Sequence, residues 1–184
     1  MPTYKQINYK NRGMFLEHLI NDSNTYYLSK DVAVIYKKPT PIKVLNVSYR
    51  SKQTTLIDKA VFSEISTLDY NGIYKGRYVE FDAKECHTTT SFPLSNIKEH
   101  QIKHIRNIIR HKGIVFLIIF MNNKFYLLKG EDLINFIDNE NRKSIPYDYI
   151  EKKGYIIKEG YMPRLDYIKT IEEAYIKGEI NEKC

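Results

Sequence analysis

Two short segments carry most of the structural information in this chain: Ser66-Thr67-Leu68-Asp69-Tyr70-Asn71-Gly72, followed by Val79-Glu80-Phe81-Asp82-Ala83-Lys84. Residues 67–70 and 77–85 are predicted to form two neighbouring strands, with Asn71-Gly72 as a turn signal between them. Asp82 and Lys84 are two positions apart, so on a strand their side chains point to the same face. Asp69 on the neighbouring strand can join them. Two carboxylates and a lysine are therefore expected to converge at one edge of a sheet.

This set of side chains suits the hydrolysis of phosphodiesters. Carboxylate oxygens bind Mg²⁺, which keeps several of its waters and contacts phosphate. The cation lowers the pKa of a bound water, and a nearby lysine offsets the charge that develops in the transition state. An Asp-x-Lys pair alone is better explained by an ordinary ion pair on a solvated strand face, so the interpretation depends on the rest of the chain.

The remaining pattern alternates between helical and strand-like segments. Helices are expected from Arg12 to about Tyr27 and over 131–138 and 165–177. A further helix is expected to run to about His111, because Asn96 and Glu99 form a capping-box pattern ahead of it. Strands are expected at 32–37, from Ile42 onward, in the apolar run 114–121, and at 125–128 after Asn122-Asn123. Gly113 is placed where the end of a helix favours a left-handed residue. The expected architecture is a single-domain α/β fold with a mixed sheet between helices.

The charge of the chain is positive and unevenly distributed. There are 29 Lys and Arg against 22 Asp and Glu in 184 residues, a net charge of +7. The basic residues concentrate in three segments, 1–12, 37–59 and 98–112, which favours a polyanionic partner. The composition excludes a disordered, collagen-like or disulfide-dense protein. We also expect no transmembrane helix, no signal peptide and a reducing compartment for the two cysteines.

In the order and identity of its short motifs, the chain resembles the RecU-type Holliday junction resolvases of the PD-(D/E)XK nuclease superfamily. The matching blocks cover nearly the whole chain: Asn11-Arg12-Gly13-Met14, Lys38-Pro39-Thr40-Pro41, Ser66 to Gly72, Phe81-Asp82-Ala83-Lys84-Glu85, Ser91-Phe92-Pro93-Leu94, His100-Gln101-Ile102 and Pro163-Arg164-Leu165-Asp166-Tyr167. The resemblance implies a restriction-endonuclease-like fold over residues 1–184, with a central mixed sheet flanked by helices and a protruding β stalk at about 39–59.

The resemblance also implies the site. Its Mg²⁺ ligands correspond to Thr67, Asp69, Asp82 and Gln101, with Mn²⁺ able to substitute, and its transition-state-stabilising residue corresponds to Lys84. Asp69, Asp82 and Lys84 are the expected catalytic residues. The family usually has Glu at the position of Asp82, and aspartate keeps the metal-binding carboxylate on a side chain that is one methylene shorter.

DNA contacts are expected from the stalk and from the N-terminal segment. Residues 38–59 have a net charge of +4, from Lys38, Lys43, Arg50, Lys52 and Lys59 against Asp58. Arg12, Lys43, Arg50 and Lys52 are therefore candidates for phosphate contact. From the residues alone, an exposed hairpin whose lysines prevent edge pairing is an equally good explanation of the stalk.

The implied function is resolution of four-way DNA junctions by paired nicks that leave 5′-phosphates, in recombination and repair. A homodimer matches the two-fold symmetry of such a junction. Further expectations are a recombinase filament as partner, no membrane, and a cytoplasmic, nucleoid-associated location. The alternatives are another structure-specific nuclease of the same fold and a non-catalytic junction-binding recombination factor.

Three further residues are weaker candidates. Glu17 on the first helix is a candidate for an additional acid near the metal, although an exposed helical glutamate is the favoured explanation. His100 and His104 are four positions apart, a spacing that permits zinc ligation. No third ligand with suitable spacing accompanies them, so we expect them to contact backbone or DNA.

Overall fold

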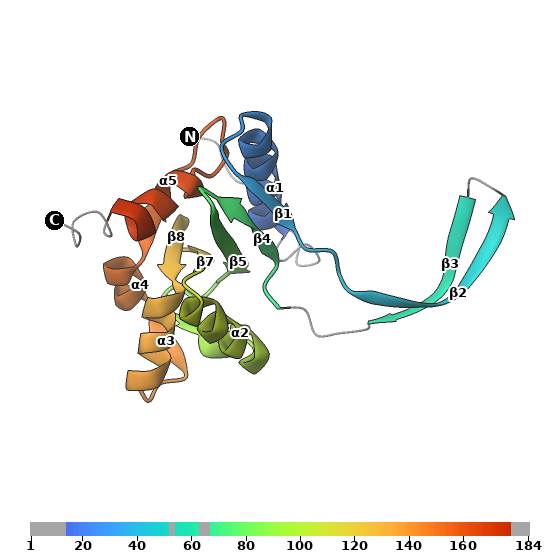
Figure 1. Ribbon diagram of the computed structural model, residues 1–184. Helices are drawn as coiled ribbons and strands as arrows, with labels where there is room; N and C mark the ends of the chain where they lie inside the picture. Colours follow the sequence, from blue (N-terminus) through green and yellow to red (C-terminus); the bar gives the residue numbers. More distant parts are fainter. Residues whose placement is uncertain (1–13, 52–53, 63–66, 178–184) are drawn as a thin grey trace.

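The computed structural model describes residues 14–51, 54–62 and 67–177. Within them the main sheet contains, in spatial order, β1 (Val34–Lys37), β4 (Tyr70–Tyr74), β5 (Arg77–Glu85), β7 (Ile114–Met121), β8 (Lys124–Lys129) and β10 (Tyr155–Ile157). β5 and β7 run parallel, and the other neighbouring pairs run antiparallel. Helices lie on both sides of this sheet (Figure 1), which confirms the predicted mixed sheet flanked by helices. No helix in the described part of the chain is long and apolar enough to cross a membrane.

Helix α1 (Met14–Ser29) packs against β1 and β5. Its buried residues recur at helical spacing, as expected for a helix with one buried face: Leu16, Leu19, Ile20, Ser23, Asn24 and Tyr27. The backbone N–H of Leu16 donates to Oε1 of Glu85 at 2.8 Å, so a carboxylate at the end of β5 caps the first turn. The predicted helix is confirmed from Met14 onward.

The turn between β4 and β5 differs from the prediction. Asn71 and Gly72 lie inside β4, and the turn is formed by Lys75 and Gly76, whose φ angles are 47° and 74°. Gly72 is needed for another reason, because a Cβ there would lie 2.0 Å from the carbonyl oxygen of Val34 on β1. The Asn-Gly signal reports a local preference, whereas the pairing of β4 with β1 is a tertiary contact that overrides it.

A parallel βαβ unit connects β5 to β7 through α2 (Glu99–Arg110). The predicted capping box of Asn96 and Glu99 is wrong, because Asn96 ends a separate 3-10 turn, η2 (Leu94–Asn96). The N–H of Lys98 instead donates to Oε1 of Gln101 at 3.0 Å. Helix α2 therefore begins at a contact made by one of the predicted site residues.

The residue that ends α2 in the left-handed region is Lys112 (φ 60°), not Gly113 as predicted. A Cβ at position 113 would lie 2.6 Å from Cγ2 of Ile108, so close packing against α2 explains this glycine. The following apolar run forms β7, and every residue from Ile114 to Ile119 is buried. The predicted turn at Asn122 and Asn123 is confirmed, since both have positive φ.

The C-terminal half adds helices and short strands around the sheet. Helix α3 (Gly130–Asn139) confirms a prediction, and the predicted helix at 165–177 is present as α5 (Tyr167–Ile171) continued by the π-helical turn η3 (Glu172–Ile176). Four short elements were not predicted: helix α4 (Tyr147–Lys153), β10, and the strands β6 (Ser91–Pro93) and β9 (Ser144–Pro146), which form a small sheet. These elements are three to seven residues long, too short to show a clear period.

Hydrophobic side chains are buried on both faces of the sheet. One cluster joins α1, α5 and η3 to residues such as Phe81, Phe116 and Ile118. The other joins α2, α3 and α4 to residues such as Leu117 and Ile119, which alternate with the first set along β7. Because β7 is buried on both faces, its sequence is apolar throughout.

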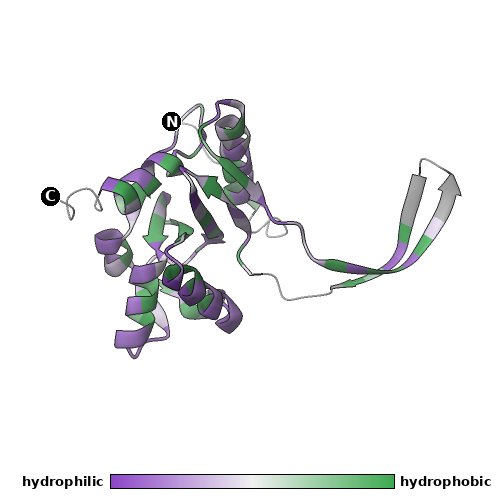
Figure 2. Cartoon of the chain, in the orientation of Figure 1, coloured by the Kyte–Doolittle hydropathy of each residue, from purple (hydrophilic) through white to green (hydrophobic). Residues whose placement is uncertain are grey.

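The remaining strands, β2 (Ile42–Ser51) and β3 (Thr54–Phe62), form a separate antiparallel sheet. We call this hairpin the projection, because it extends away from the body of the protein (Figure 1). Both hydrophobic and hydrophilic residues occur along its coloured part (Figure 2), and Ile42, Leu45 and Ile57 are among its exposed hydrophobic residues.

Candidate active site

Strand β5 positions the central residues of the candidate site. Its side chains alternate, so Val79 and Phe81 enter the cluster beneath α1, while Asp82 and Lys84 face the side covered by α2. Nζ of Lys84 lies 2.8 Å from Oδ2 of Asp82, which confirms that the two share a face. Asp82 is fully buried, and the side chain of Lys84 is 22% exposed. β5 is an interior strand, so the predicted convergence occurs on the face of the sheet and not at its edge.

Asp69 joins this pair from the residue directly before β4. Its backbone carbonyl accepts the N–H of Lys38 at 2.7 Å, which ties it to the end of β1. Its carboxyl group hydrogen-bonds to that of Asp82, and burial together with this second carboxylate raises the pKa of Asp69 to about 7. Lys84 and Lys37 oppose the rise. Asp69, Asp82 and Lys84 therefore form one compact group, which we call the acid–lysine cluster.

Gln101, in the first turn of α2, contacts the acid–lysine cluster with its amide nitrogen. Nε2 donates to Oδ2 of Asp82 at 2.9 Å and to the carbonyl oxygen of Thr67 at 3.0 Å. Its Oε1 accepts the N–H of Lys98. In this arrangement Gln101 orients Asp82 and Thr67, and its amide oxygen serves the start of the helix.

Thr67 presents its backbone and its hydroxyl in different directions. The carbonyl oxygen accepts from Gln101, whereas Oγ1 receives a hydrogen bond from Nζ of Lys38 at 2.6 Å. The same hydroxyl donates to Oε1 of Glu80 at 3.2 Å. Thr67 is thus adjacent to the acid–lysine cluster, with its hydroxyl in a separate set of contacts around Glu80.

Glu80 is the main site-adjacent residue that sequence reasoning missed. It is fully buried on β5, two residues before Asp82, and its carboxylate contacts Lys38, Thr67, Tyr78 and His104. Burial raises the pKa of Glu80, but hydrogen bonds from Lys38, His104 and Tyr78 outweigh burial and leave that pKa below its usual range. The alternation along β5 already placed Glu80 on the face of Asp82 and Lys84, and that signal could have identified it.

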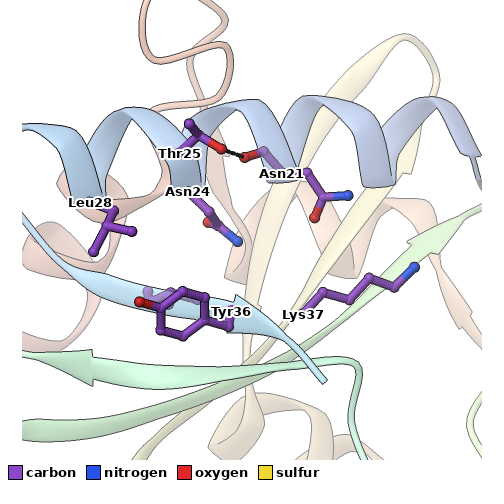
Figure 3. A pocket seen from close by; sticks show the side chains of 7 residues that line it. Asn21, Asn24, Thr25, Leu28, Tyr36 and Lys37 are labelled. Carbon is purple, nitrogen blue, oxygen red and sulfur yellow. Dashed lines mark hydrogen bonds between the residues drawn. The ribbon is translucent and has the colours of Figure 1, made fainter. Parts of the chain in front are cut away.

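Helix α1 approaches the opposite face of the sheet. Glu17 pairs with Lys37 at 2.5 Å, so its carboxylate is engaged with the end of β1. Between α1 and β1 lies a hollow of about 170 Å³ (Figure 3), whose polar lining residues include Asn21, Asn24 and Lys37. No carboxylate lines this hollow, so it does not have the ligands of a metal site.

A second hollow, of about 440 Å³, lies beside the acid–lysine cluster. Its lining runs from the end of β5 through the following loop to η2, and consists of Ala83, Lys84, Glu85, Cys86, His87, Thr88, Pro93 and Asn96. Lys84 belongs to both the hollow and the cluster. The hollow therefore reaches the acid–lysine cluster at Lys84, from the C-terminal end of β5.

Of the predicted DNA-binding residues, Lys43 is the one whose side chain the structure describes, and it lies in the projection. This side chain is exposed on β2. The backbone of Arg50 is part of the same strand, but its side chain, Lys52 and Arg12 lie outside the described residues. Their expected phosphate contacts stay predictions.

The donor set around Asp69 and Asp82 fits a hard divalent cation. Two carboxylates in hydrogen-bond contact repel one another when both are ionised, and a cation between them removes that repulsion. In the described part of the chain, no group of three or more His, Cys, Asp or Glu is placed to hold a metal. Two carboxylates supplemented by neutral oxygens and waters match Mg²⁺, which retains several of its waters in proteins.

The fold and the site together define an α/β protein in which an interior strand carries an Asp-x-Lys pair beside a second aspartate. Residues 11–173 match the family described as RecU: Recombination protein U, and the chain belongs to that family. It is 47% identical over 178 residues to the Holliday junction resolvase RecU of Bacillus subtilis (strain 168), covering 95% of this chain and 86% of that protein. The RecU of Geobacillus sp. (strain WCH70) is 46% identical over 175 residues, covering 92% and 87% respectively. That of Shouchella clausii (strain KSM-K16) is 43% identical over 178 residues, covering 95% and 86%.

Proposed function

We propose that this protein is a Mg²⁺-dependent endodeoxyribonuclease that resolves four-way DNA junctions in homologous recombination and repair. The observation that carries the proposal is the acid–lysine cluster, in a chain that belongs to the RecU family. Relatives at 43–47% identity over most of both chains are named Holliday junction resolvases. A chain that served only to bind junctions would have no use for two carboxylates held together at a cost in repulsion.

In this proposal Asp69 and Asp82 hold the cation, and Gln101 keeps Asp82 in the binding orientation. Thr67 would complete the site through a neutral oxygen. A cation held there would supply a water of lowered pKa and would polarise the scissile phosphate. Lys84 is close enough to Asp82 to face the same phosphate, where its ammonium group stabilises the charge that develops in the transition state. Attack by water on the phosphorus would break its bond to the 3′ oxygen, which leaves as a 3′-hydroxyl and leaves a 5′-phosphate on the other strand end. Mn²⁺ would substitute for Mg²⁺.

The substrate backbone would enter by the hollow beside Lys84. The projection then supplies a second, distant surface, on which Lys43 and Lys59 are exposed. Contacts of this kind are to phosphates and carry no base sequence, as suits an enzyme that recognises the shape of a junction. Arg50 and Lys52 in the projection, and Arg12 in the N-terminal segment, are proposed as further phosphate contacts.

Resolution requires two nicks related by the symmetry of the junction, so we propose an isologous homodimer with one site per subunit. A protein acting on recombination intermediates works where the chromosome is, and we therefore infer a cytoplasmic, nucleoid-associated location. A recombinase filament is proposed as a further partner, since it produces the substrate.

A nicking assay on a mobile four-way junction, with and without Mg²⁺, tests the proposal. We expect paired nicks only with Mg²⁺ or Mn²⁺, and much slower cleavage of linear duplex, flap and fork substrates. Asp82→Asn should bind the junction and fail to nick it, whereas Asp148→Asn, an exposed aspartate on α4, should behave like the wild type. Equal cleavage of linear duplex would favour another nuclease of this fold, and binding without cleavage by the wild type would favour a non-catalytic factor.

A further inference from the structure

Glu80 makes contacts from four different segments of the chain while its side chain is fully buried. Oε1 accepts from Nζ of Lys38 and from Oγ1 of Thr67, the latter at 3.2 Å. Oε2 accepts from the hydroxyl of Tyr78 at 2.7 Å and lies 2.8 Å from Nε2 of His104. A carboxylate has about four lone-pair sites, so every acceptor position of Glu80 is occupied.

Two of these partners stand at the two ends of the connection that carries the projection. Lys38 follows β1 and directly precedes the Pro39-Thr40-Pro41 segment that leads into β2. Thr67 is the first described residue after β3. Nζ of Lys38 also donates to Oγ1 of Thr67 at 2.6 Å, so Glu80 and Lys38 together tie the outgoing and returning chains to β5.

The same contacts continue into the acid–lysine cluster. The N–H of Lys38 donates to the carbonyl oxygen of Asp69 at 2.7 Å. The carbonyl oxygen of Thr67 accepts from Gln101, whose Nε2 also donates to Asp82. Lys38 is therefore one hydrogen bond from the backbone of Asp69, and Thr67 is connected to the carboxylate of Asp82 through the two hydrogen bonds of Gln101.

We propose that Glu80 is a positioning residue that fixes the direction of the projection relative to the pair Asp69 and Asp82. Its importance for cleavage rests on the proposed function, because the projection and the two aspartates need a fixed relative position only if one substrate contacts both. The prolines at 39 and 41 limit bending between Lys38 and β2, so anchoring Lys38 also orients the strand that follows.

A role in folding alone makes a different prediction. Removing one partner of a buried ion pair is strongly destabilising, whereas replacing both partners with apolar residues is often neutral. Lys38→Met/Glu80→Leu should therefore restore the stability that Glu80→Gln loses. Tyr78 and His104 are partly exposed, so water can satisfy them in the double variant. If Glu80 acts as a positioning residue, the double variant regains the stability of the wild type but not the fixed direction of the projection.

The experiment measures the distance between spin labels at Lys59→Cys on the projection and Glu140→Cys after α3, both exposed, in a Cys184→Ser background with Cys86 buried. Affinity for Mn²⁺ and the melting temperature are measured in parallel. We expect Glu80→Gln to broaden the distance distribution and to weaken Mn²⁺ binding roughly 10-fold. The double variant should recover the melting temperature and keep the broad distribution.

The matched control is Glu172→Gln, which removes a carboxylate that also accepts from a tyrosine and a lysine, Tyr74 and Lys75. It should change neither the distance distribution nor Mn²⁺ affinity. If Glu80→Gln does not fold, Tyr78→Phe, which removes one donor, replaces it. The proposal is overturned if the folded Glu80→Gln variant keeps the wild-type distance distribution. It is also overturned if the double variant recovers the narrow wild-type distribution together with its melting temperature. The label distance, the Mn²⁺ affinity and the melting temperature are all measured without junction cleavage. A failure of the proposed function would appear instead in the nicking assay.

Discussion

The amide of Gln101 joins the carboxylate of Asp82 to the start of α2, with Nε2 donating to Oδ2 at 2.9 Å and Oε1 accepting the N–H of Lys98 at 3.0 Å. Loss of a partner that orients a metal-binding carboxylate typically lowers metal affinity about 10–100-fold. We expect Gln101→Ala to weaken Mn²⁺ binding by about 10-fold in isothermal titration calorimetry. Asn107→Ala, at an exposed position of the same helix, should leave the affinity unchanged. Equal affinity in the two variants would mean that other contacts hold Asp82.

Replacement of Lys84 should slow cleavage of the phosphodiester without weakening cation binding. In the metal-free protein the ammonium group of Lys84 lies 2.8 Å from Oδ2 of Asp82. A cation that binds this oxygen must therefore displace the ammonium group. We expect Lys84→Met to bind Mn²⁺ at least as tightly as the wild type, while single-turnover nicking falls by about 10²–10³. Lys103→Met on the exposed face of α2 is the comparison for loss of one positive charge. Nicking at the wild-type rate would remove Lys84 from the catalytic residues.

Asp69 should make the stability of the metal-free protein depend on pH. Its pKa is about 7 in the folded protein, against an ordinary value of 3.8, because of burial and the carboxylate of Asp82. Between these values the folded state binds more protons at Asp69 than the unfolded state does. The free energy of unfolding therefore falls as pH rises through this range. Mg²⁺ should oppose the loss, because the cation binds the deprotonated carboxylates.

The measurement is calorimetric unfolding in a chelator from about pH 4 to about pH 8, the range that the pKa shift defines. Subtracting the melting temperatures of Asp69→Asn isolates this residue from other titrating groups. The wild type should lose stability relative to the variant as pH rises, and Asp148→Asn should show no such difference. A pH-independent difference between wild type and Asp69→Asn would contradict the assigned pKa.

Local periodicity was sufficient to predict the elements that carry Asp82 and Lys84. Alternation along β5 gave their shared face, and the apolar run 114–121 predicted the buried strand β7, whose parallel pairing with β5 was not predicted. Pairing of Asp69 with this face followed from the prediction that the two segments are adjacent. The stretch 77–85 is long enough for its alternation, and 114–121 for its continuous apolar character, to outweigh local turn preferences.

Tertiary contacts explain what the sequence did not reveal. The turn falls at Lys75-Gly76 because Gly72 is needed where β1 passes, a fact that depends on a strand far away in the chain. Glu80 has partners from 2 to 42 positions away, so no local pattern indicates that its carboxylate is satisfied. Gln101 was expected at the site from the family resemblance alone, as a Mg²⁺ ligand and not as a donor to Asp82. Which amide atom faces Asp82 depends on where α2 begins.

Gly72 should be intolerant of any side chain. A Cβ at this position would lie 2.0 Å from the carbonyl oxygen of Val34 and 2.6 Å from Cα of Ile35, and backbone atoms cannot move aside without opening the β1–β4 pairing. We expect Gly72→Ala to lower the free energy of unfolding by about 1–3 kcal/mol, as overpacking typically does. Urea denaturation measures the change. Gly76→Ala, where nothing lies within 4 Å of the added Cβ, costs only the strain of a positive φ and should be milder.

The exposed lysines of the projection should determine how junction affinity responds to salt. Each protein contact that neutralises a phosphate contributes a slope of about 0.9 to the fall of log affinity with log salt concentration. Lys43 and Lys59 are exposed on β2 and β3 of the projection, which extends away from the body that contains the acid–lysine cluster (Figure 1). If both contact phosphates, Lys43→Ala/Lys59→Ala should reduce the slope by nearly 2 and leave Mn²⁺ affinity unchanged. Fluorescence anisotropy with a labelled junction in Ca²⁺ from about 50 to about 300 mM salt measures the slope. Lys152→Ala, an exposed lysine on α4, should leave the slope unchanged, and the same result for the double variant would mean that the projection does not contact the DNA backbone through these residues.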